Sequence, residues 1–176
     1  LGKNALDWAF AQQPDVLCVQ EIKARPDQLT EKQRDFPGYH VTWNPAERPG
    51  YSGVATFTSA SPLDVELCLA VARFDIEGRV IRTRHPGFLL YNIYFPNGQR
   101  GKDRVDYKLD FYARLLEICN GLHAAGENII ITGDFNTAYT MQMTSTMDPS
   151  PPGMTAPSVT TVKMERLGDC DPGTTP

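Results

Sequence analysis

Residues 14–24 read Pro-Asp-Val-Leu-Cys-Val-Gln-Glu-Ile-Lys-Ala, a short apolar run that ends in the polar pair Gln20 and Glu21. Four consecutive apolar residues between polar neighbours are typical of a strand that is buried on both faces. Upstream, apolar residues recur at helical spacing from 4 to 12, and Pro14 ends that pattern. A helix followed by a buried strand is the first unit of a predicted α/β protein.

Helix and strand patterns alternate along the rest of the chain. A short helix is predicted within 26–35, and further strands are predicted at 39–43, 53–58, 65–69, 79–84, 88–95 and 128–132. The strongest helix prediction covers 104–123, where one face is apolar: Val105, Leu109, Tyr112, Leu115, Leu116, Cys119 and Leu122. This mixed order favours α/β layers around stacked sheets.

The composition is that of a globular protein with a core. Of the 176 residues, 41% are hydrophobic and 22% are charged, which is ordinary for a folded domain. No apolar run approaches the roughly 18 residues of a membrane-spanning helix, so we expect no membrane partner. The cysteines, Cys18, Cys68, Cys119 and Cys170, form no CxxC pair, which argues against zinc and favours a reducing, cytoplasmic location.

The charge distribution differs between the whole chain and its middle. The net charge of -4 argues against a protein that coats nucleic acid by bulk charge. Between positions 73 and 108, eight Lys or Arg accompany four acidic residues, a local excess of four positive charges. An anionic ligand could dock there, but on charge alone a solvated surface is the preferred interpretation.

The last forty residues change in composition. All five methionines lie here, with many Thr and Pro and without Phe or Trp, and no strand or helix period is evident. We therefore predict a partial folded domain over 1–138 and a divergent Met/Thr/Pro-rich tail over 139–176. The tail is expected to be disordered or to result from a frame shift.

Polar residues stand where three predicted strands end. Glu21 follows the first apolar strand, Tyr94 and Asn97 lie at the end of the 88–95 strand, and Asp134 and Asn136 follow the 128–132 strand. Their carboxylate and amide oxygens suit a hard cation such as Mg²⁺. Each residue alone also fits a solvated loop or a turn.

Several sequence blocks resemble one known family. The run at 14–24 is similar to a block of the exonuclease III family and its apurinic endonuclease relatives, in the endonuclease/exonuclease/phosphatase superfamily. Further blocks of that family follow in order: Pro37-Gly38-Tyr39, Trp43-Asn44-Pro45-Ala46, Gly50-Tyr51-Ser52-Gly53-Val54-Ala55, Glu77-Gly78-Arg79-Val80, Asn92-Ile93-Tyr94-Phe95-Pro96-Asn97-Gly98-Gln99, Tyr107-Lys108-Leu109-Asp110-Phe111-Tyr112 and Gly133-Asp134-Phe135-Asn136-Thr137-Ala138. Collinear blocks over 1–138 are far more specific than any one block.

The resemblance implies a fold, an activity and residue roles. The fold would be a DNase I-like four-layer α/β sandwich. The activity would be metal-dependent phosphodiester hydrolysis in base excision repair, by a 3′ to 5′ exonuclease and apurinic/apyrimidinic endonuclease. Glu21 would bind Mg²⁺, with Mn²⁺ as an alternative. Tyr94 and Asn97 would contact the phosphate, Asp134 would orient or deprotonate the attacking water, and Asn136 would hydrogen-bond the phosphate.

The implied partner is double-stranded DNA with abasic sites or 3′ ends, bound by a monomer. Arg100, Lys102 and Arg104 follow the strand that ends near Tyr94, and we expect them to grip the DNA backbone. A solvated loop is the alternative interpretation of these three residues.

Two parts of the family pattern are not found in the sequence. These are a first strand that ends in an asparagine of the metal site and a C-terminal half-domain with a Ser-Asp-His motif. None of His40, His85 and His123 follows Ser-Asp, so we interpret all three as structural or surface residues. We therefore expect an incomplete fold and weak or absent activity from this chain alone.

Two other functions are weighed against the nuclease. A non-catalytic nucleic-acid-binding module of the same fold would have no reason to keep Glu21, Asp134 and Asn136 together. A lipid or sugar-phosphate phosphatase of the superfamily is disfavoured by the blocks at 20–24 and 94–98, which are similar to the DNA branch.

Overall fold

The structure, a computed structural model, describes residues 5–34, 36–98 and 101–136. Arg100 and the predicted tail at 139–176 lie outside the described residues. The described strands form two sheets, one in the order β1-β3-β2 and the other in the order β4-β5-β6-β7. Within the described part of the chain, no helix is both long enough and apolar enough to cross a membrane.

The first sheet is antiparallel and is covered by aromatic packing. Its strands are β1 (Val16–Gln20), β2 (His40–Asn44) and β3 (Val54–Thr58), and it is accompanied by α1 (Ala5–Ala11), the 3-10 turn η1 (Pro26–Gln28) and α2 (Glu31–Arg34). The central strand β3 is buried throughout. Its Phe57 ring meets Phe10 of α1 at 5.3 Å and Trp43 of β2 at 5.8 Å between ring centroids. These contacts fix α1 on the sheet, while Trp8 of the same helix is 70% exposed.

The second sheet contains the main core. Its strands are β4 (Asp64–Glu66), β5 (Val80–His85), β6 (Phe88–Tyr94) and β7 (Ile129–Asp134). β6 and β7 run parallel, and the long helix α4 (Lys102–Ala124) connects them, as a parallel pair requires. Phe111 and Leu115 of α4 are buried against Leu89, Tyr91 and Ile93 of β6. The parallel pairing brings the carboxyl ends of β6 and β7 to the same edge.

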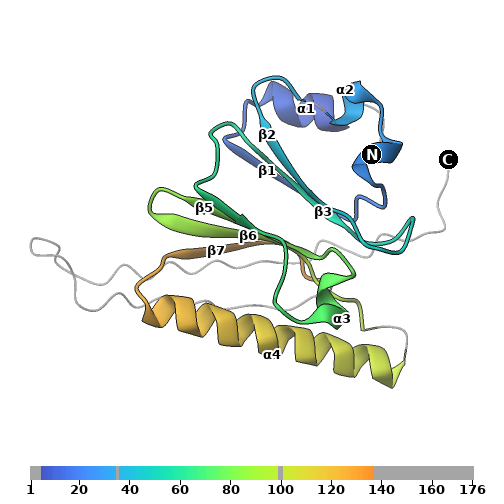
Figure 1. Ribbon diagram of the computed structural model, residues 1–176, viewed down its shortest axis with the longest axis vertical. Coiled ribbons are helices and arrows are strands. Elements are labelled where there is room, and N and C mark those ends of the chain that lie inside the picture. Colours follow the sequence, from blue (N-terminus) through green and yellow to red (C-terminus); the bar gives the residue numbers. More distant parts are fainter. Residues whose placement is uncertain (1–4, 35, 99–100, 137–176) are drawn as a thin grey trace, which may run out of the picture. The chain divides into compact units, whose positions relative to one another are not determined.

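Buried amides link the facing sheets. Asn44 of β2 donates to the Val80 carbonyl of β5 at 2.7 Å, and Asn92 of β6 donates to the Ala55 carbonyl of β3 at 2.9 Å. In Figure 1, α1 and α2 lie outside the first sheet and α4 lies outside the second. The layers are thus helix, sheet, sheet and helix, which confirms the predicted four-layer α/β sandwich.

The region after β4 differs from the prediction. The strand predicted at 65–69 ends at Glu66, and the helix α3 (Ala72–Asp75) was not predicted. The Asp75 carboxylate accepts hydrogen bonds from the backbone N–H groups of Leu69 and Val71, at 2.7 and 2.9 Å. These side-chain-to-backbone bonds take the chain out of the sheet, and a four-residue helix is too short to show periodicity.

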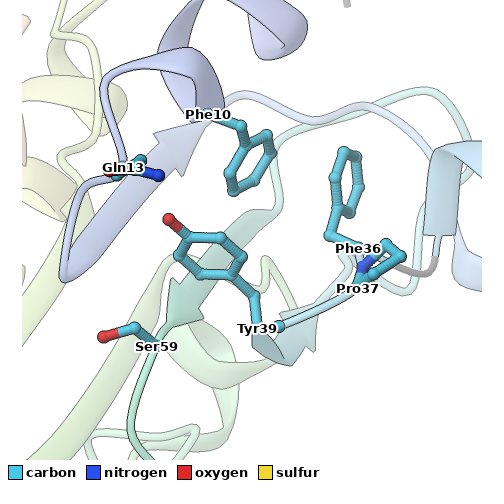
Figure 2. A pocket seen from close by; sticks show the side chains of 7 residues that line it. Phe10, Gln13, Phe36, Pro37, Tyr39 and Ser59 are labelled. Atoms are coloured by element: carbon cyan, nitrogen blue, oxygen red, sulfur yellow. The ribbon is translucent and has the colours of Figure 1, made fainter.

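A hollow of about 420 Å³ lies at the far end of the first sheet. Figure 2 shows the rings of Phe10, Phe36 and Tyr39 around it, with Ser59 at its border. Ser59 follows β3 and donates its backbone N–H to the Asp15 carbonyl, just before β1 begins. Because β1 rises by roughly 3.3 Å per residue, the far end of that strand is about 15 Å away, so the hollow is separate from residues that follow β1.

Candidate active site

Two of the predicted site residues end neighbouring parallel strands. Tyr94 is the last residue of β6, Asp134 is the last residue of β7, and the two are partners in the strand register. The ladder continues for one more bond, because the Phe95 N–H donates to the Asp134 carbonyl at 2.9 Å. The exposed Asp134 side chain therefore stands beside Tyr94 at the edge of the second sheet.

Glu21 reaches this edge from the first sheet through a backbone turn. Its φ of 54° lies in the left-handed region, which side-chain-bearing residues rarely adopt and which ends β1. Hydrogen bonds from the Ile22 and Lys23 N–H groups to the carbonyls of Gly53 and Ser52 hold the turn, at 3.1 and 2.9 Å. The carboxylate is 45% exposed and pairs with the Lys23 ammonium at 2.9 Å.

The Tyr94 hydroxyl joins Glu21 to Asn136. Burial raises the pKa of Tyr94 to about 12, and the charge of Glu21 and the hydrogen bond to it add to this effect, whereas Arg79 and Asn136 oppose it. Partial burial also favours a higher pKa for Glu21, but hydrogen bonds from Lys23 and Tyr94 outweigh it and hold that pKa below its ordinary value. At neutral pH the phenol is therefore a neutral donor, and the carboxylate is ionised.

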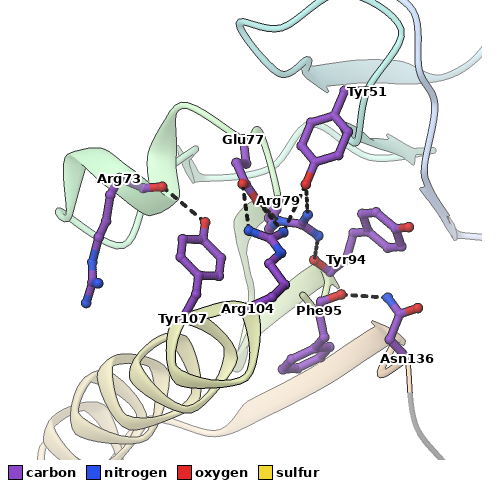
Figure 3. A network of polar contacts seen from close by, with 9 residues as sticks. All are labelled: Tyr51, Arg73, Glu77, Arg79, Tyr94, Phe95, Arg104, Tyr107 and Asn136. Carbon is purple, nitrogen blue, oxygen red and sulfur yellow. Dashed lines mark hydrogen bonds and ion pairs between the residues drawn. The ribbon is translucent and has the colours of Figure 1, made fainter. Parts of the chain in front are cut away.

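Asn136 is fixed from two directions. Its Nδ2 donates to the Phe95 carbonyl at 2.6 Å, as Figure 3 shows, and its backbone N–H donates to Asp134 Oδ1 at 2.9 Å. Its φ of 51° again lies in the left-handed region. Strained backbone at two of the predicted site residues, Glu21 and Asn136, is a pattern that often accompanies functional sites.

A network of buried and half-buried charges contacts the backbone of Tyr94. The Arg79 guanidinium donates to Glu77, to the Tyr94 carbonyl at 2.9 Å and to the Tyr51 hydroxyl at 2.9 Å. Arg104 donates to the same Tyr51 hydroxyl at 2.9 Å and to both oxygens of Glu77 at 3.1 Å. Figure 3 shows these side chains converging between α4 and the ends of the strands. Two guanidiniums share one carboxylate, so the network carries an excess positive charge.

Sequence reasoning gave Tyr51, Glu77 and Arg79 of this network no role, and it assigned Arg104 to the DNA backbone instead. Arg79 is only 3% exposed, yet a charged residue at a strand end looks like surface in a sequence. The available signal was that Tyr51, Glu77 and Arg79 all lie in the blocks that resemble the family. Lys108 of α4 was missed for the same reason. It is buried, and burial lowers its pKa although the charge of Asp134 opposes this shift.

The residues predicted to bind substrate have different surroundings. Asn97 is half-buried in the segment after β6, and Lys102 is the exposed first residue of α4. Arg104 is half-buried and is engaged with Glu77 and Tyr51 rather than extended into solvent. Arg100 lies outside the described residues, so the DNA-binding roles of this group stay predictions.

The donor set at the site consists of oxygen atoms. Within residues 5–34, 36–98 and 101–136, no three His, Cys, Asp or Glu residues form a group arranged to hold a metal ion. Glu21 and Asp134 are separate, accessible carboxylates, and a hard cation needs only one or two of these when water and substrate phosphate complete its shell. The residues present thus fit such an ion in the company of substrate. Unlike these two carboxylates, the His85 side chain is not accessible, because it is buried and stacked on Phe88 with ring centroids 4.9 Å apart.

Stacked sheets between helices, with a carboxylate, a phenol and an amide gathered at their strand ends, define a sandwich of the DNase I-like type. The chain belongs to the endonuclease/exonuclease/phosphatase family, whose model matches residues 2–162. Members of this family generally depend on a divalent metal ion.

Named relatives support this assignment. The chain is 38% identical over 143 residues to the DNA repair nuclease APEX1 of Danio rerio, covering 78% of this chain and 44% of that relative. It is 34% identical over 134 residues to an exodeoxyribonuclease of Bacillus subtilis (strain 168), covering 76% and 52%. A solved 3′-5′ exonuclease from Neisseria meningitidis superposes with a TM-score of 0.65 and 28% identity, covering 76% and 52%. The chain thus spans about half the length of these relatives.

Proposed function

We propose that the chain carries part of the active site of a metal-dependent DNA-repair nuclease. It would hydrolyse phosphodiester bonds as a 3′ to 5′ exonuclease and an apurinic/apyrimidinic endonuclease. The observation that supports this most is the meeting of Glu21 and Asn136 at the Tyr94 hydroxyl, beside Asp134. Relatives that are called a DNA repair nuclease and an exodeoxyribonuclease point to the same chemistry.

Glu21 would hold the metal, which we propose to be Mg²⁺, with Mn²⁺ as an alternative. When bound, the ion would neutralise charge that develops on the phosphate during the displacement. Glu21 suits this role because its carboxylate is accessible, and its lowered pKa keeps it ionised to a lower pH than an ordinary glutamate. Its present partner, the Lys23 ammonium, is 55% exposed and can move aside into solvent.

Tyr94 and Asn136 would bind the phosphate. A phenol whose pKa is about 12 keeps its proton at neutral pH, so it can turn from Glu21 to donate to a phosphate oxygen. The Asn136 amide is anchored on the Phe95 carbonyl at 2.6 Å, which limits its freedom before substrate arrives. Asn97, in the segment after β6, would contact a further phosphate oxygen.

Asp134 would position the attacking water and accept its proton. Its Oδ1 accepts the Asn136 N–H at 2.9 Å, which fixes the carboxylate and leaves Oδ2 to face a water. The charge of Asp134 acts on the Lys108 ammonium of α4, so this cation is close to the proposed base.

Double-stranded DNA with abasic sites or 3′ ends is the proposed substrate. Lys102 is exposed at the start of α4, and the guanidiniums of Arg79 and Arg104 give the edge below Tyr94 a positive charge. We also propose a monomer. For a reducing, cytoplasmic compartment, which we propose as well, the support is the free thiols of Cys18, Cys68 and Cys119.

Titration of the 176-residue chain with Mn²⁺, followed by the electron paramagnetic resonance signal of the free ion, tests the metal site. We expect Glu21→Gln to weaken binding about tenfold or more, because it removes the charged ligand. Asp110→Asn is the matched control, since Asp110 is an exposed carboxylate of α4 that pairs with Arg73 at 2.8 Å. Equal affinity in the parent and in Glu21→Gln would refute the assigned ligand.

Single-turnover cleavage, with protein in excess over a duplex that carries one abasic site, tests the reaction. We expect slow cleavage that needs Mg²⁺ and stops with EDTA. Asp134→Ala should lower the rate about 100-fold or more while DNA binding stays measurable. Retained turnover in that variant would contradict the role of Asp134, and hydrolysis of inositol phosphates in preference to DNA would favour the phosphatase.

A further inference from the structure

A hydrogen bond joins the two sheets next to the candidate site. Gln20, the last residue of β1, donates from Nε2 to Asn92 Oδ1 of β6 at 2.7 Å, across 72 positions of sequence. Gln20 directly precedes Glu21, and Asn92 precedes Tyr94 by two positions. The bond therefore connects the two backbone segments that carry Glu21 and Tyr94.

The orientation of the Asn92 amide is determined by its surroundings. Asn92 is fully buried, and its Nδ2 donates to the Ala55 carbonyl at 2.9 Å and to Thr56 Oγ1 at 3.0 Å. A carbonyl can only accept a hydrogen bond, so Nδ2 must face Ala55 and Oδ1 must face Gln20. The acceptor for Gln20 is thus held in one place by the central strand of the first sheet.

The strand geometry also determines the direction in which the Tyr94 side chain points. Side chains two positions apart on a strand point to the same face, so Tyr94 points toward the first sheet as Asn92 does. If β1 continued, the Glu21 side chain would point opposite to that of Gln20, away from the second sheet. Its φ of 54° turns the chain at this position, and the carboxylate instead reaches the Tyr94 hydroxyl. A small shift of Gln20 would therefore be passed on to the carboxylate.

We propose that Gln20 and Asn92 are positioning residues that set the separation between Glu21 and the Tyr94 hydroxyl. For catalysis this rests on the proposed function, since it assumes that these two side chains act on one substrate. The contact itself can be tested without metal, DNA or turnover. Asn44 supplies a matched comparison, because its buried amide also links the sheets through the Leu67 and Val80 carbonyls, at 2.8 and 2.7 Å.

The experiment places 3-fluorotyrosine at position 94 of the 176-residue chain and records its ¹⁹F resonance. Glu21→Gln is expected to shift that resonance in the parent, because the carboxylate contacts the hydroxyl. In a Gln20→Met background, which keeps the side-chain size but removes the donor, the shift should shrink at least about twofold. In an Asn44→Leu background it should keep its full size. Circular dichroism verifies that each variant is folded.

An unchanged Glu21→Gln shift in folded Gln20→Met would overturn the proposal. Equal loss in the Gln20→Met and Asn44→Leu backgrounds would also overturn it, because it would show a general effect of loosened sheets. Asn92→Leu provides a second route if Gln20→Met unfolds, since it keeps the side-chain size but removes the acceptor for Gln20, and it should also shrink the shift at least about twofold. Mn²⁺ added to the parent reports separately on the proposed function. Failure to broaden the resonance would count against the metal site and leave the positioning result standing.

Discussion

Individual side chains at the candidate site are controlled by burial and by charges supplied from other elements. Tyr94 keeps its proton to a higher pH than an ordinary tyrosine because it is half-buried beside the Glu21 carboxylate, and Glu21 stays ionised to a lower pH than an ordinary glutamate because Lys23 and Tyr94 donate to it. Neither property belongs to the residue type alone, since an exposed tyrosine and an exposed glutamate would titrate at their ordinary values.

Acid should weaken the protein through Glu77. Hydrogen bonds from Arg104 and Arg79 outweigh the effect of burial and hold the pKa of Glu77 below its ordinary value of 4.5. The stability that this carboxylate contributes is therefore present above about pH 4.5 and is lost as pH falls through the depressed pKa. Urea unfolding of the chain at pH 7, 5, 4 and 3 should show a steep loss only at the acidic end.

Glu77→Gln should lower the free energy of unfolding at pH 7 by roughly 2–4 kcal/mol, because it leaves the buried guanidinium of Arg79 and the half-buried guanidinium of Arg104 without their carboxylate. The variant should also lose part of the acid dependence. Glu117→Gln is the control, since its carboxylate is 70% exposed and its pair with Arg114 is expected to contribute less than about 1 kcal/mol. Similar losses in both variants would show that the network does not stabilise the fold.

The thiols should differ in reactivity. Burial raises the pKa of Cys18 to about 11, against the effect of a hydrogen bond from Thr56, and burial also raises the pKa of Cys119. Cys68 is exposed. With iodoacetamide at pH 8 and detection by mass spectrometry, Cys68 should be labelled at least about tenfold faster than Cys18. Denatured chain serves as the control, and comparable labelling of Cys18 in the native chain would contradict its burial.

The sequence predicted which residues meet at the candidate site better than it predicted their surroundings. Glu21, Tyr94 and Asp134 stand out in the sequence as polar residues after apolar runs, and the structure brings them together, while their functional roles stay predictions. Arg79 and the Gln20–Asn92 bond were missed, because burial of a charge or an amide depends on packing between sheets. That packing joins residues 72 positions apart, which no local pattern encodes.

Among the elements, those with strong periodicity or a clear apolar run were predicted, and a very short helix was not. The helix predicted at 104–123 is α4 (Lys102–Ala124), because its core-facing residues, including Phe111 and Leu115, recur at helical spacing. The apolar run at 16–19 is β1 (Val16–Gln20), but this strand is half-buried at the edge of its sheet rather than buried on both faces as predicted, because only β3 pairs with it. In contrast, α3 (Ala72–Asp75) depends on one carboxylate that accepts two backbone bonds, and such capping leaves little trace in a hydrophobic pattern.

The strand β7 should not tolerate a side chain at Gly133. A Cβ at this position would overlap the Ile93 carbonyl of β6, and the φ of 148° adds strain. We expect Gly133→Ala to cost about 2 kcal/mol or more in the free energy of unfolding and to displace Asp134. Gly126→Ala is the control, because Gly126 also has a positive φ, of 84°, but its added Cβ meets nothing within 4 Å. Thermal melts of both variants decide the prediction, and equal losses would show that contact with β6 is unimportant.

For the whole molecule, charge distribution should govern the proposed DNA binding. The chain is negative overall, at -4, so attraction must come from a limited positive edge that includes Lys102 and Arg104. We expect log K against log salt to have a slope of about -3 or shallower, as a few neutralised phosphates would give. Fluorescence anisotropy of a labelled abasic duplex at several KCl concentrations measures it. A slope near -10 would indicate a far larger basic surface than this fold presents.

The two tryptophans differ in environment, one half-buried and one exposed, and this gives the protein a built-in optical signal. Trp43 packs edge-on against Phe57 in the first sheet, whereas Trp8 is 70% exposed and already resembles an indole in water. The change in emission wavelength on unfolding should therefore come almost wholly from Trp43. A Trp8→Phe chain would report the opening of the first sheet alone, and comparison with far-ultraviolet ellipticity would reveal whether the second sheet melts at the same temperature.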